Sequence, residues 1–485
     1  MPAADAEIQT LIAQYQEVEA QIRRSNPRYA TLVQPVPLSA RELQQQALDA
    51  DTLLLEYLLG RERSYLWAVS ATSVASFELP GRAEIETLAQ RVYDRLKARP
   101  RRQAEGDRPG RVLELKTPRP ESRGLRLRDQ DEAQASEAAA ALSRMLLGPV
   151  AELLGNKRLL IVADGSLQYV PFAALPDPTA LTVGQERRPP LMVAHEIISL
   201  PSASTLAVLR RELAGRKPAA KTLAVLADPV FAKDDERIKT GARRAASQTG
   251  QPTPAPGAEI ILRPISKNSD GEAGEARFSR LPFTRQEAEQ IMALVAAGEG
   301  MKALDFEASR ATAMSDQLSQ YRYIHFATHG LADSERAELS TLVLSLFDEQ
   351  GAPQEGFLRA HEIYNLNLPA ELVTLSACET GLGKQVKGEG LVSLARGFMY
   401  AGAARVMVSL WNVNDQATSE LMRRFYRKAL VEGERPAAAL RAAQIGCGAI
   451  NGGKRRTTGR LSRCKASGGK PDGRYYERPA PEFRT

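Results

Sequence analysis

The sequence predicts an α/β protein whose mainly parallel sheet is covered by helices on both faces. Three apolar segments of strand length occur in the second half of the chain, at residues 323–328, 372–377 and 405–411. A helix separates the last two segments, and its apolar stripe consists of Leu391, Leu394, Ala395, Phe398 and Met399. Strands that alternate with helices form parallel sheets, because each crossover helix covers a face of the sheet.

Short helices are expected at the N-terminus. Apolar residues recur at helical spacing over residues 8–22, and this pattern stops before Pro27. A second helix is predicted to begin at Ser39, because its hydroxyl can cap the helix while Glu42 completes a capping box. These helices precede the sheet-forming part of the chain.

Two further stretches complete the expected order of elements. The first contains strands at 52–79 with a turn at 60–62, a helix at 84–98, a linker at 100–128, a helix at 132–154 and a strand at 158–163. The second contains a strand at 222–227, a solvated insertion at 239–277, and helices at 285–296 and 308–320 around a short strand. We therefore divide the chain into N-terminal helices (1–49), a smaller α/β half (50–215), a larger α/β half (216–445) and a tail (446–485).

The composition is that of an ordinary globular protein, with 43% hydrophobic and 25% charged residues. The first ten residues lack the basic start and apolar run of a signal peptide, and no later segment is apolar enough to span a membrane. We therefore expect a cytoplasmic protein with no membrane partner. Three cysteines cannot form a disulfide framework, and the four histidines are too few and too scattered to pair with them as a zinc site.

The net charge of +7 is located in the tail. Residues 446–485 contain ten Lys or Arg against three Asp or Glu, which leaves the rest of the chain neutral overall. A nucleic-acid partner is therefore not expected for the folded body. The tail also contains Cys447 and Cys464, so Cys378 is the one cysteine that lies outside it.

The tail departs from the rest of the chain in composition as well. Apolar periodicity continues to about Ile445 and then gives way to Gly, Lys, Arg, Ser and Thr, with few aliphatic residues. A back-translation with ordinary codons, read one frame over from the Gly446 codon, gives a coherent aromatic and apolar peptide. We interpret the tail as the product of a frameshift near Ile445, with a genuine basic tail as the alternative.

Two of the predicted strands carry reactive residues at their carboxyl ends. His329 and Gly330 follow the strand at 323–328, and Cys378 follows the strand at 372–377. The carboxyl ends of parallel strands meet at one edge of a sheet, so neighbouring strands would bring the imidazole and the thiol together. Nucleophilic catalysis needs this pairing, because a base must take the proton of the attacking thiol. The backbone N–H groups of Gly330 and Cys378 are candidates for an oxyanion hole.

Four motifs carry a resemblance to a known family. They are YIHFATHG (323–330), LSACETG (375–381), GEGLVSLARGF (388–398) and VSLWNVND (408–415). Over about residues 53–444 the chain resembles the CHAT domain, a family of caspase- and separase-like proteases that commonly follow tetratricopeptide repeats. The resemblance implies a caspase-like fold in which His329 and Cys378 are the catalytic dyad. His329 precedes Cys378 by 49 residues, which agrees with the order and the separation of about 50 residues in caspases.

The family's repeat array is absent from the printed sequence. Residues 1–49 therefore resemble the remnant of a junction between repeats and protease. By the same resemblance, the apolar peptide of the shifted frame is similar to the aromatic end of the domain, and a C-terminal strand is missing from the printed tail.

The candidate residues also have structural explanations. Cys378 could be a buried structural thiol, but its strand-end position and His329 favour the nucleophile. His325 lies within the strand, which favours a hydrogen-bonded core position. Asp415 could line a substrate pocket that prefers a basic residue before the scissile bond, or could cap the helix at 416–430.

Glu379 is a second candidate for the substrate pocket. Glu379 and Glu389 could also orient the imidazole or cap loops, and the sequence does not separate these roles. His195 and His361 are expected to be structural or surface residues.

These observations predict a cysteine endopeptidase that cleaves a protein substrate through a Cys-His dyad and an acyl-enzyme, and that needs no metal or organic cofactor. The resemblance implies a setting in bacterial signalling, defence or programmed death, with a regulatory or repeat-containing partner that controls activity. The alternative is a catalytically silent CHAT scaffold that acts as a protein-interaction module.

Restoring the reading frame after Ile445 is expected to raise the melting temperature. The lost apolar strand area, at about 25 cal/mol per Å², would remove several kcal/mol from a typical free energy of unfolding of about 5–15 kcal/mol. Thermal unfolding of the printed and frame-restored chains tests this. Equal melting temperatures, or an uninterrupted frame on resequencing of the locus, would contradict the frameshift.

Overall fold

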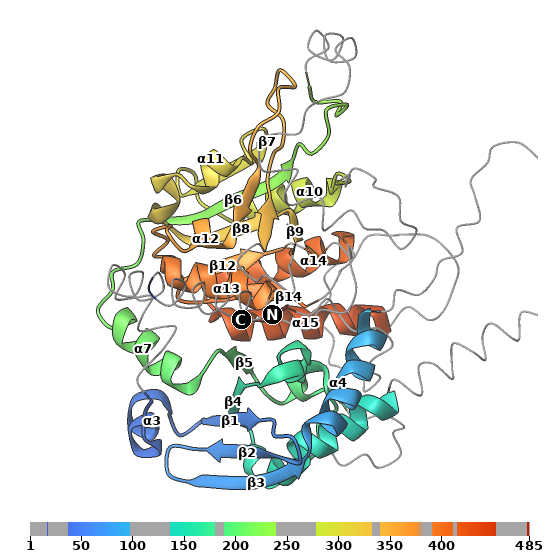
Figure 1. Cartoon of the computed structure of the whole chain (residues 1–485). Helices are drawn as coiled ribbons and strands as arrows, with labels where there is room; N and C mark the ends of the chain where they lie inside the picture. The colour runs from blue at the N-terminus through green and yellow to red at the C-terminus, as the bar shows by residue number, and fades with distance from the viewer. Residues whose placement is uncertain are drawn as a thin grey trace, which may run out of the picture.

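The described residues of the chain form three sheets and the helices that cover them (Figure 1). The structure is a computed structural model, and it describes residues 17, 37–97, 136–179, 189–238, 278–331, 340–376, 378–379, 390–410, 415–452 and 483–484. In Figure 1 the N-terminal sheet lies below the large C-terminal sheet, and helix α15 (Pro436–Gly452) runs along the boundary between them.

The N-terminal sheet begins with an antiparallel meander. Helix α3 precedes its three strands, and helix α4 follows them. The elements are α3 (Ala40–Ala47), β1 (Thr52–Leu58), β2 (Arg63–Val69), β3 (Val74–Pro80) and α4 (Arg82–Lys97). The predicted capping box is present: the N–H of Glu42 donates to the Ser39 hydroxyl at 3.3 Å, and the N–H of Ser39 donates to the Glu42 carboxylate at 2.8 Å.

Two parallel strands complete this sheet, whose order is β3-β2-β1-β4-β5. They are β4 (Arg158–Val162) and β5 (Ile197–Leu200), and helix α7 (Ala203–Leu213) follows. Helical residues 136–147 lead to η1 (Gly148–Val150) and α6 (Ala151–Leu154). The helix expected at 132–154 is thus interrupted at Pro149, because proline has no N–H to donate to the preceding turn.

Short 3-10 segments connect β4 to β5. They are η2 (Gly165–Tyr169), η3 (Phe172–Ala174) and η4 (Leu191–Val193). The last of them contacts the C-terminal half. The guanidinium of Arg441 on α15 donates to the carbonyls of Met192 and Val193, each at 2.6 Å, and so joins η4 to α15.

The C-terminal sheet confirms the predicted mainly parallel arrangement. Its order is β15-β14-β12-β8-β6-β7, and every pairing except that of β15 is parallel. The strands are β6 (Lys221–Pro229), β7 (Gly300–Asp305), β8 (Tyr321–Ala327), β12 (Leu372–Leu375), β14 (Val406–Ser409) and β15 (Phe483–Arg484). The two strands expected to deliver the reactive residues, β8 and β12, are direct neighbours.

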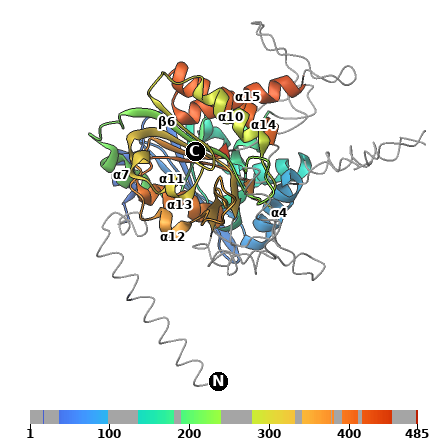
Figure 2. The same ribbon diagram turned by 90° about the horizontal axis from the view of Figure 1, so that it is seen from above.

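Helices cover both faces of this sheet, as Figure 2 shows from above. On one face lie α10 (Pro282–Met292), α14 (Asp415–Tyr426) and α15; on the other lie α11 (Arg310–Ala313), α12 (Ala360–Ile363) and α13 (Gly390–Ala401). Alternate residues of β8 follow this division. Ile324 and Phe326 pack in the core beside α12 and α13, whereas Tyr323 and Ala327 pack in the core beside α10 and α14.

A third sheet of four short strands continues from the carboxyl edge of the large one. Its order is β11-β10-β9-β13, and its strands are β9 (His329–Leu331), β10 (Thr341–Val343), β11 (Phe357–Arg359) and β13 (Cys378–Glu379). β9 follows β8 after one residue, and β13 follows β12. The sequence did not predict this sheet, because strands of two or three residues are too short to show periodicity.

Other segments also differ from the sequence-based expectation. The helix expected at 308–320 is divided into α11 and η5 (Asp316–Gln320), and the Ser315 hydroxyl donates to the carbonyl of Thr312 at 2.8 Å where the first turn ends. A π-helical turn, η7 (Arg427–Val431), extends α14. The segments 100–128 and 239–277, and the helix at 8–22 except for the helical Glu17, lie outside the described residues.

The described end of the chain contains two elements. α15 continues past Ile445 to Gly452, and β15 pairs antiparallel with β14 through Val408 with Arg484 and Ser409 with Phe483. The sheet edge that was expected to lack a strand therefore carries one of two residues. Within the described residues, no helix combines the length and apolarity that crossing a bilayer requires.

Replacing Phe326 by alanine is expected to lower the free energy of unfolding by about 3–5 kcal/mol. Its side chain is fully buried and its ring centroid lies 5.5 Å from that of Phe398. Urea unfolding followed by circular dichroism measures the change. Val431→Ala, at a position that is 62% exposed, is the control and should change stability by less than about 0.5 kcal/mol. Similar losses in both variants would contradict the packing described here.

Candidate active site

The third sheet places His329 and Cys378 directly opposite one another. In the parallel pairing of β9 with β13, Cys378 is the partner of His329 and Glu379 is the partner of Gly330. Neighbouring strands lie roughly 4.8 Å apart. The backbones of the two predicted reactive residues are therefore adjacent.

One register runs through both sheets. Leu375 on β12 pairs with Phe326 on β8, and three residues further on Cys378 pairs with His329. The separation of 49 residues between His329 and Cys378 is thus the offset of the whole β8–β12 pairing. The sequence spacing has a direct structural cause.

The imidazole of His329 lies against two aromatic rings and a backbone carbonyl. The residue is 5% exposed, and its ring centroid is 5.0 Å from that of Phe231 and 5.6 Å from that of Phe278. Nε2 lies 2.7 Å from the carbonyl oxygen of Ser279. A carbonyl can only accept, so Nε2 carries the proton in this contact.

The other ring nitrogen, Nδ1, has no hydrogen-bond partner among the described residues. In a neutral imidazole that donates from Nε2, Nδ1 has the lone pair and can accept a proton. The contact with Ser279 therefore selects the tautomer whose basic nitrogen is unoccupied by any described group.

The surroundings of His329 favour its neutral form. Burial lowers the pKa of the imidazole below its usual 6.5, and the hydrogen bond to the Ser279 carbonyl offsets part of that decrease. A neutral imidazole is the form that can act as a base. His329 is therefore available as a base at neutral pH.

The other predicted site residues occupy defined positions in the backbone. Gly330 lies at the centre of β9, opposite Leu342 of β10 on one side and Glu379 of β13 on the other. Asp415 is the first residue of α14. Glu389 lies outside the described residues.

His325 is confirmed as a hydrogen-bonded core residue. It is fully buried, with Nε2 2.7 Å from a carboxylate oxygen of Glu287 on α10 and Nδ1 3.1 Å from the hydroxyl of Tyr426 on α14. The Tyr426 hydroxyl in turn donates to the Thr374 hydroxyl on β12 at 3.2 Å. This network joins two strands to two helices beneath the candidate site.

The remaining histidines match the structural or surface positions expected for them. His195 is buried, and its Nδ1 lies 2.8 Å from the carbonyl of Lys157. His361 is exposed on α12. Across the described part of the chain, no group of three or more His, Cys, Asp or Glu side chains is arranged to hold a metal ion.

Cys447 is a poor candidate for a nucleophile. It lies on α15 and packs against the core beside α14, and burial raises the pKa of its thiol to about 11. The thiol therefore stays protonated at neutral pH, and a protonated thiol is a weak nucleophile.

Sequence reasoning did not find Phe231, Phe278 or Ser279. Phe278 and Ser279 directly follow the segment at 239–277, which was expected to be a solvated insertion. Their contribution comes from ring packing and a main-chain carbonyl, and neither has a motif. No signal in the sequence pointed to them.

Comparison with known proteins gives a family and two kinds of relative. The CHAT domain family matches residues 136–455. Human tetratricopeptide repeat protein 28 is 24% identical over 322 residues, which cover 60% of this chain and 11% of that protein. The mouse protein of the same name is 37% identical over 87 residues, which cover 18% of this chain and 4% of the relative. This chain therefore spans about a tenth of the human relative and less of the mouse one.

Two solved structures of the Saccharomyces cerevisiae separase-securin complex are also similar. The structure at 3.0 Å resolution has a TM-score of 0.46 at 9% identity and covers 83% of this chain and 30% of that chain. The structure at 2.6 Å has a TM-score of 0.36 at 10% identity and covers 84% of this chain and 30% of that chain.

Replacing Phe231 by alanine is expected to raise the pKa of His329 toward its ordinary value. Removing the ring admits water, which solvates the imidazolium and reverses part of the desolvation. A histidine NMR titration measures the pKa, and Tyr65→Ala in the N-terminal sheet is the control. A His329 pKa that is not lowered in the wild type, or that does not move in Phe231→Ala, would show that the ring of Phe231 does not desolvate the imidazole.

The same shift makes folding depend on pH. The pKa of His329 is lower in the folded than in the unfolded state, so the unfolded chain binds a proton more readily. The contribution of neutral His329 to the free energy of unfolding is therefore complete above a pH of about 6.5, the ordinary histidine pKa, and it declines as the pH falls toward the lowered pKa of the folded state. We expect His329→Gln to remove this part of the pH dependence. Urea unfolding of the wild type and of His329→Gln between pH 5 and pH 8, about the range in which an ordinary histidine titrates, tests whether the free energy of unfolding falls as the pH is lowered in the wild type and falls less in the variant.

Proposed function

This chain belongs to the CHAT domain family, and from that premise we propose that it is a caspase-like cysteine endopeptidase with Cys378 as nucleophile and His329 as general base. The observation that carries the proposal is the backbone register that pairs Cys378 with His329. Residues directly opposite one another on neighbouring strands share a face of the sheet, which is the arrangement that a nucleophile and its base require.

The proposed reaction passes through an acyl-enzyme. Nδ1 of the neutral His329 accepts the thiol proton, and the thiolate of Cys378 attacks the scissile carbonyl. Collapse of the tetrahedral intermediate breaks the C–N bond, and the leaving amine takes the proton from His329. Water, deprotonated by the same imidazole, then attacks the thioester carbonyl. The C–S bond breaks, the carboxylic acid product leaves, and the proton on His329 returns to the sulfur of Cys378. No metal or organic cofactor takes part.

The charge that develops on the carbonyl oxygen needs hydrogen-bond donors. We assign this role to the backbone N–H groups of Gly330 and Cys378, which belong to the facing strands β9 and β13. The group that orients the base is the Ser279 carbonyl, because its contact with Nε2 fixes the tautomer and the ring plane.

Asp415 and Glu379 are the proposed residues of the substrate pocket. Two carboxylates there would favour a basic side chain before the scissile bond. The division at residues 215 and 216 would then separate a supporting half from the catalytic half. The same proposal includes a protein substrate and a regulatory or repeat-containing partner. It also includes a cytoplasmic location, with no nucleic-acid or membrane partner.

The biological setting rests on the family alone. The relatives described above are mammalian proteins named for tetratricopeptide repeats. They support an association of this domain with such repeats. A role in bacterial signalling or defence remains an expectation of the resemblance.

Cys378→Ala is expected to lower cleavage of a peptide library by about a thousandfold or more, and His329→Gln by about 10²–10⁴-fold. Cys447→Ala is the matched control, since its thiol is protonated and packs against the core beside α14. A thiol-directed acyl inhibitor should label the wild type and the Cys447→Ala variant, and should not label Cys378→Ala. Cleavage that survives Cys378→Ala, or a wild type that neither cleaves nor reacts, would favour the catalytically silent scaffold.

A further inference from the structure

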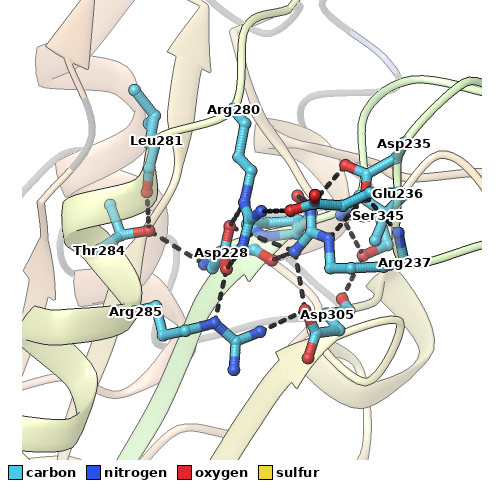
Figure 3. Close-up of polar contacts among 12 residues, drawn as sticks. Asp228, Asp235, Glu236, Arg237, Arg280, Leu281, Thr284, Arg285, Asp305 and Ser345 are labelled. Carbon is cyan, nitrogen blue, oxygen red and sulfur yellow. Dashed lines mark hydrogen bonds and ion pairs between the residues drawn. The ribbon is translucent and has the colours of Figure 1, made fainter.

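A cluster of ion pairs surrounds Asp228 at the carboxyl ends of β6 and β7 (Figure 3). The Asp228 carboxylate is fully buried and accepts hydrogen bonds from Arg280 through Nε at 2.9 Å and Nη2 at 2.8 Å. It also accepts from Nε of Arg285 at 2.9 Å, and the guanidinium of Arg237 lies 3.2 Å away. A buried carboxylate is tolerated only with such partners.

The backbone of Asp228 is fixed as well. The residue adopts a left-handed conformation with φ of 49°, at the point where the register of β6 with β7 shifts. Its N–H donates to the Thr284 hydroxyl at 3.1 Å, and its carbonyl accepts from Nη1 of Arg237 at 2.7 Å. Asp228 is thus held by its side chain and by both main-chain polar groups.

Arg280 connects this cluster to the candidate active site. Its two parallel hydrogen bonds to Asp228 are the geometry in which a guanidinium is most firmly oriented by a carboxylate. The preceding residue is Ser279, whose carbonyl accepts from Nε2 of His329. The residue before that, Phe278, packs its ring against His329. The Ser279 carbonyl therefore lies between two anchored residues.

The other side of the segment is anchored by the start of α10. The Thr284 hydroxyl that accepts from Asp228 also donates to the carbonyl of Leu281 at 2.7 Å. Asp228 therefore binds the chain on both sides of Leu281, through Arg280 and through Thr284. Movement of Asp228 would be transmitted to Ser279 across one peptide unit.

We propose that Asp228 and Arg280 are positioning residues that hold the Ser279 carbonyl against Nε2 of His329, and so keep His329 in the tautomer whose Nδ1 can serve Cys378. The inference rests on the proposed function for the role of Cys378. Neither Asp228 nor Arg280 touches a reacting atom. Their effect is on the tautomer and orientation of the base.

Arg285 provides a matched control. Like Arg280, it pairs with Asp228, and the exposed fractions of the two side chains are similar, 31% for Arg285 and 33% for Arg280. Each arginine also has a second acidic partner, which is Asp305 for Arg285 and Glu236 for Arg280. Arg285 lies within α10, away from the peptide that carries the Ser279 carbonyl. Arg280→Gln and Arg285→Gln thus remove one positive charge from the same carboxylate.

The tautomer of His329 is the direct readout and does not depend on catalysis. In the full chain labelled with ¹⁵N-histidine, the wild-type His329 signals, identified by their loss in His329→Gln, should be those of the Nε2–H form. Arg280→Gln should give a mixture of tautomers, and Arg285→Gln should give the wild-type pattern. A wild-type pattern in Arg280→Gln, or the same mixture in both variants, would overturn the proposal.

Arg280→Lys is a second variant that tests the proposal if Arg280→Gln does not fold. It keeps the positive charge but cannot form the two parallel hydrogen bonds, so it should also give a mixture of tautomers. Thermal unfolding of each variant shows whether the fold is retained. If Arg280→Gln does not fold, Arg280→Lys is compared with Arg285→Lys by the same criterion, and identical patterns in that pair would overturn the proposal.

Peptide cleavage separates this inference from the function on which it rests. We expect kcat to fall by about 10²-fold in Arg280→Gln, as for a displaced catalytic group, with KM unchanged, and to stay near the wild-type value in Arg285→Gln. Equal kcat values in an active wild type and Arg280→Gln would overturn the positioning role. A wild type without cleavage activity, but with the tautomer difference between the two variants, would remove the proposed function and support the positioning of His329.

Discussion

The parallel pairing of β8 with β12 is the constraint on which the rest of the structure depends. The two strands keep one register through the large sheet and into the small one, so that Leu375 lies opposite Phe326 and Cys378 opposite His329. A slip by one residue would move every side chain of a strand to the other face. Because β8 is buried on both faces, such a slip would place Phe326 and Tyr323 in the wrong cores.

Polar contacts reinforce this register. Thr374 and His325 are partners across the β8–β12 pairing, and the hydroxyl of Tyr426 contacts both of them. The imidazole of His325 contacts Tyr426 through Nδ1, and its other nitrogen, Nε2, contacts the buried carboxylate of Glu287. A slipped pairing would leave these groups buried without partners, which is costly in an apolar core. The hydrogen-bond network and the apolar packing therefore stabilise the same register of β8 with β12.

Much of the large sheet could be predicted from the sequence, whereas much of the site could not. The strands that precede His329 and Cys378 are long and apolar enough to be recognised in the sequence, and their carboxyl ends indicated these two residues as candidates. The four strands of the third sheet are too short to show periodicity. Ser279 contacts His329 through a main-chain carbonyl, and the Asp228 cluster joins residues distant in sequence, so neither has a motif. The prediction of one helix at 308–320 was wrong for a local reason, because the hydroxyl of Ser315 donates to the carbonyl of Thr312 and the chain turns there.

The proposed chemistry requires that the register of β8 with β12 brings a sulfur and an imidazole together. A crystal structure of the full chain measures this directly, through the distance between Sγ of Cys378 and Nδ1 of His329. We expect these two atoms to lie within hydrogen-bonding reach while Nε2 of His329 keeps its contact with the Ser279 carbonyl. Side chains on opposite faces of the β9–β13 pair, or Nδ1 directed away from the sulfur, would contradict it.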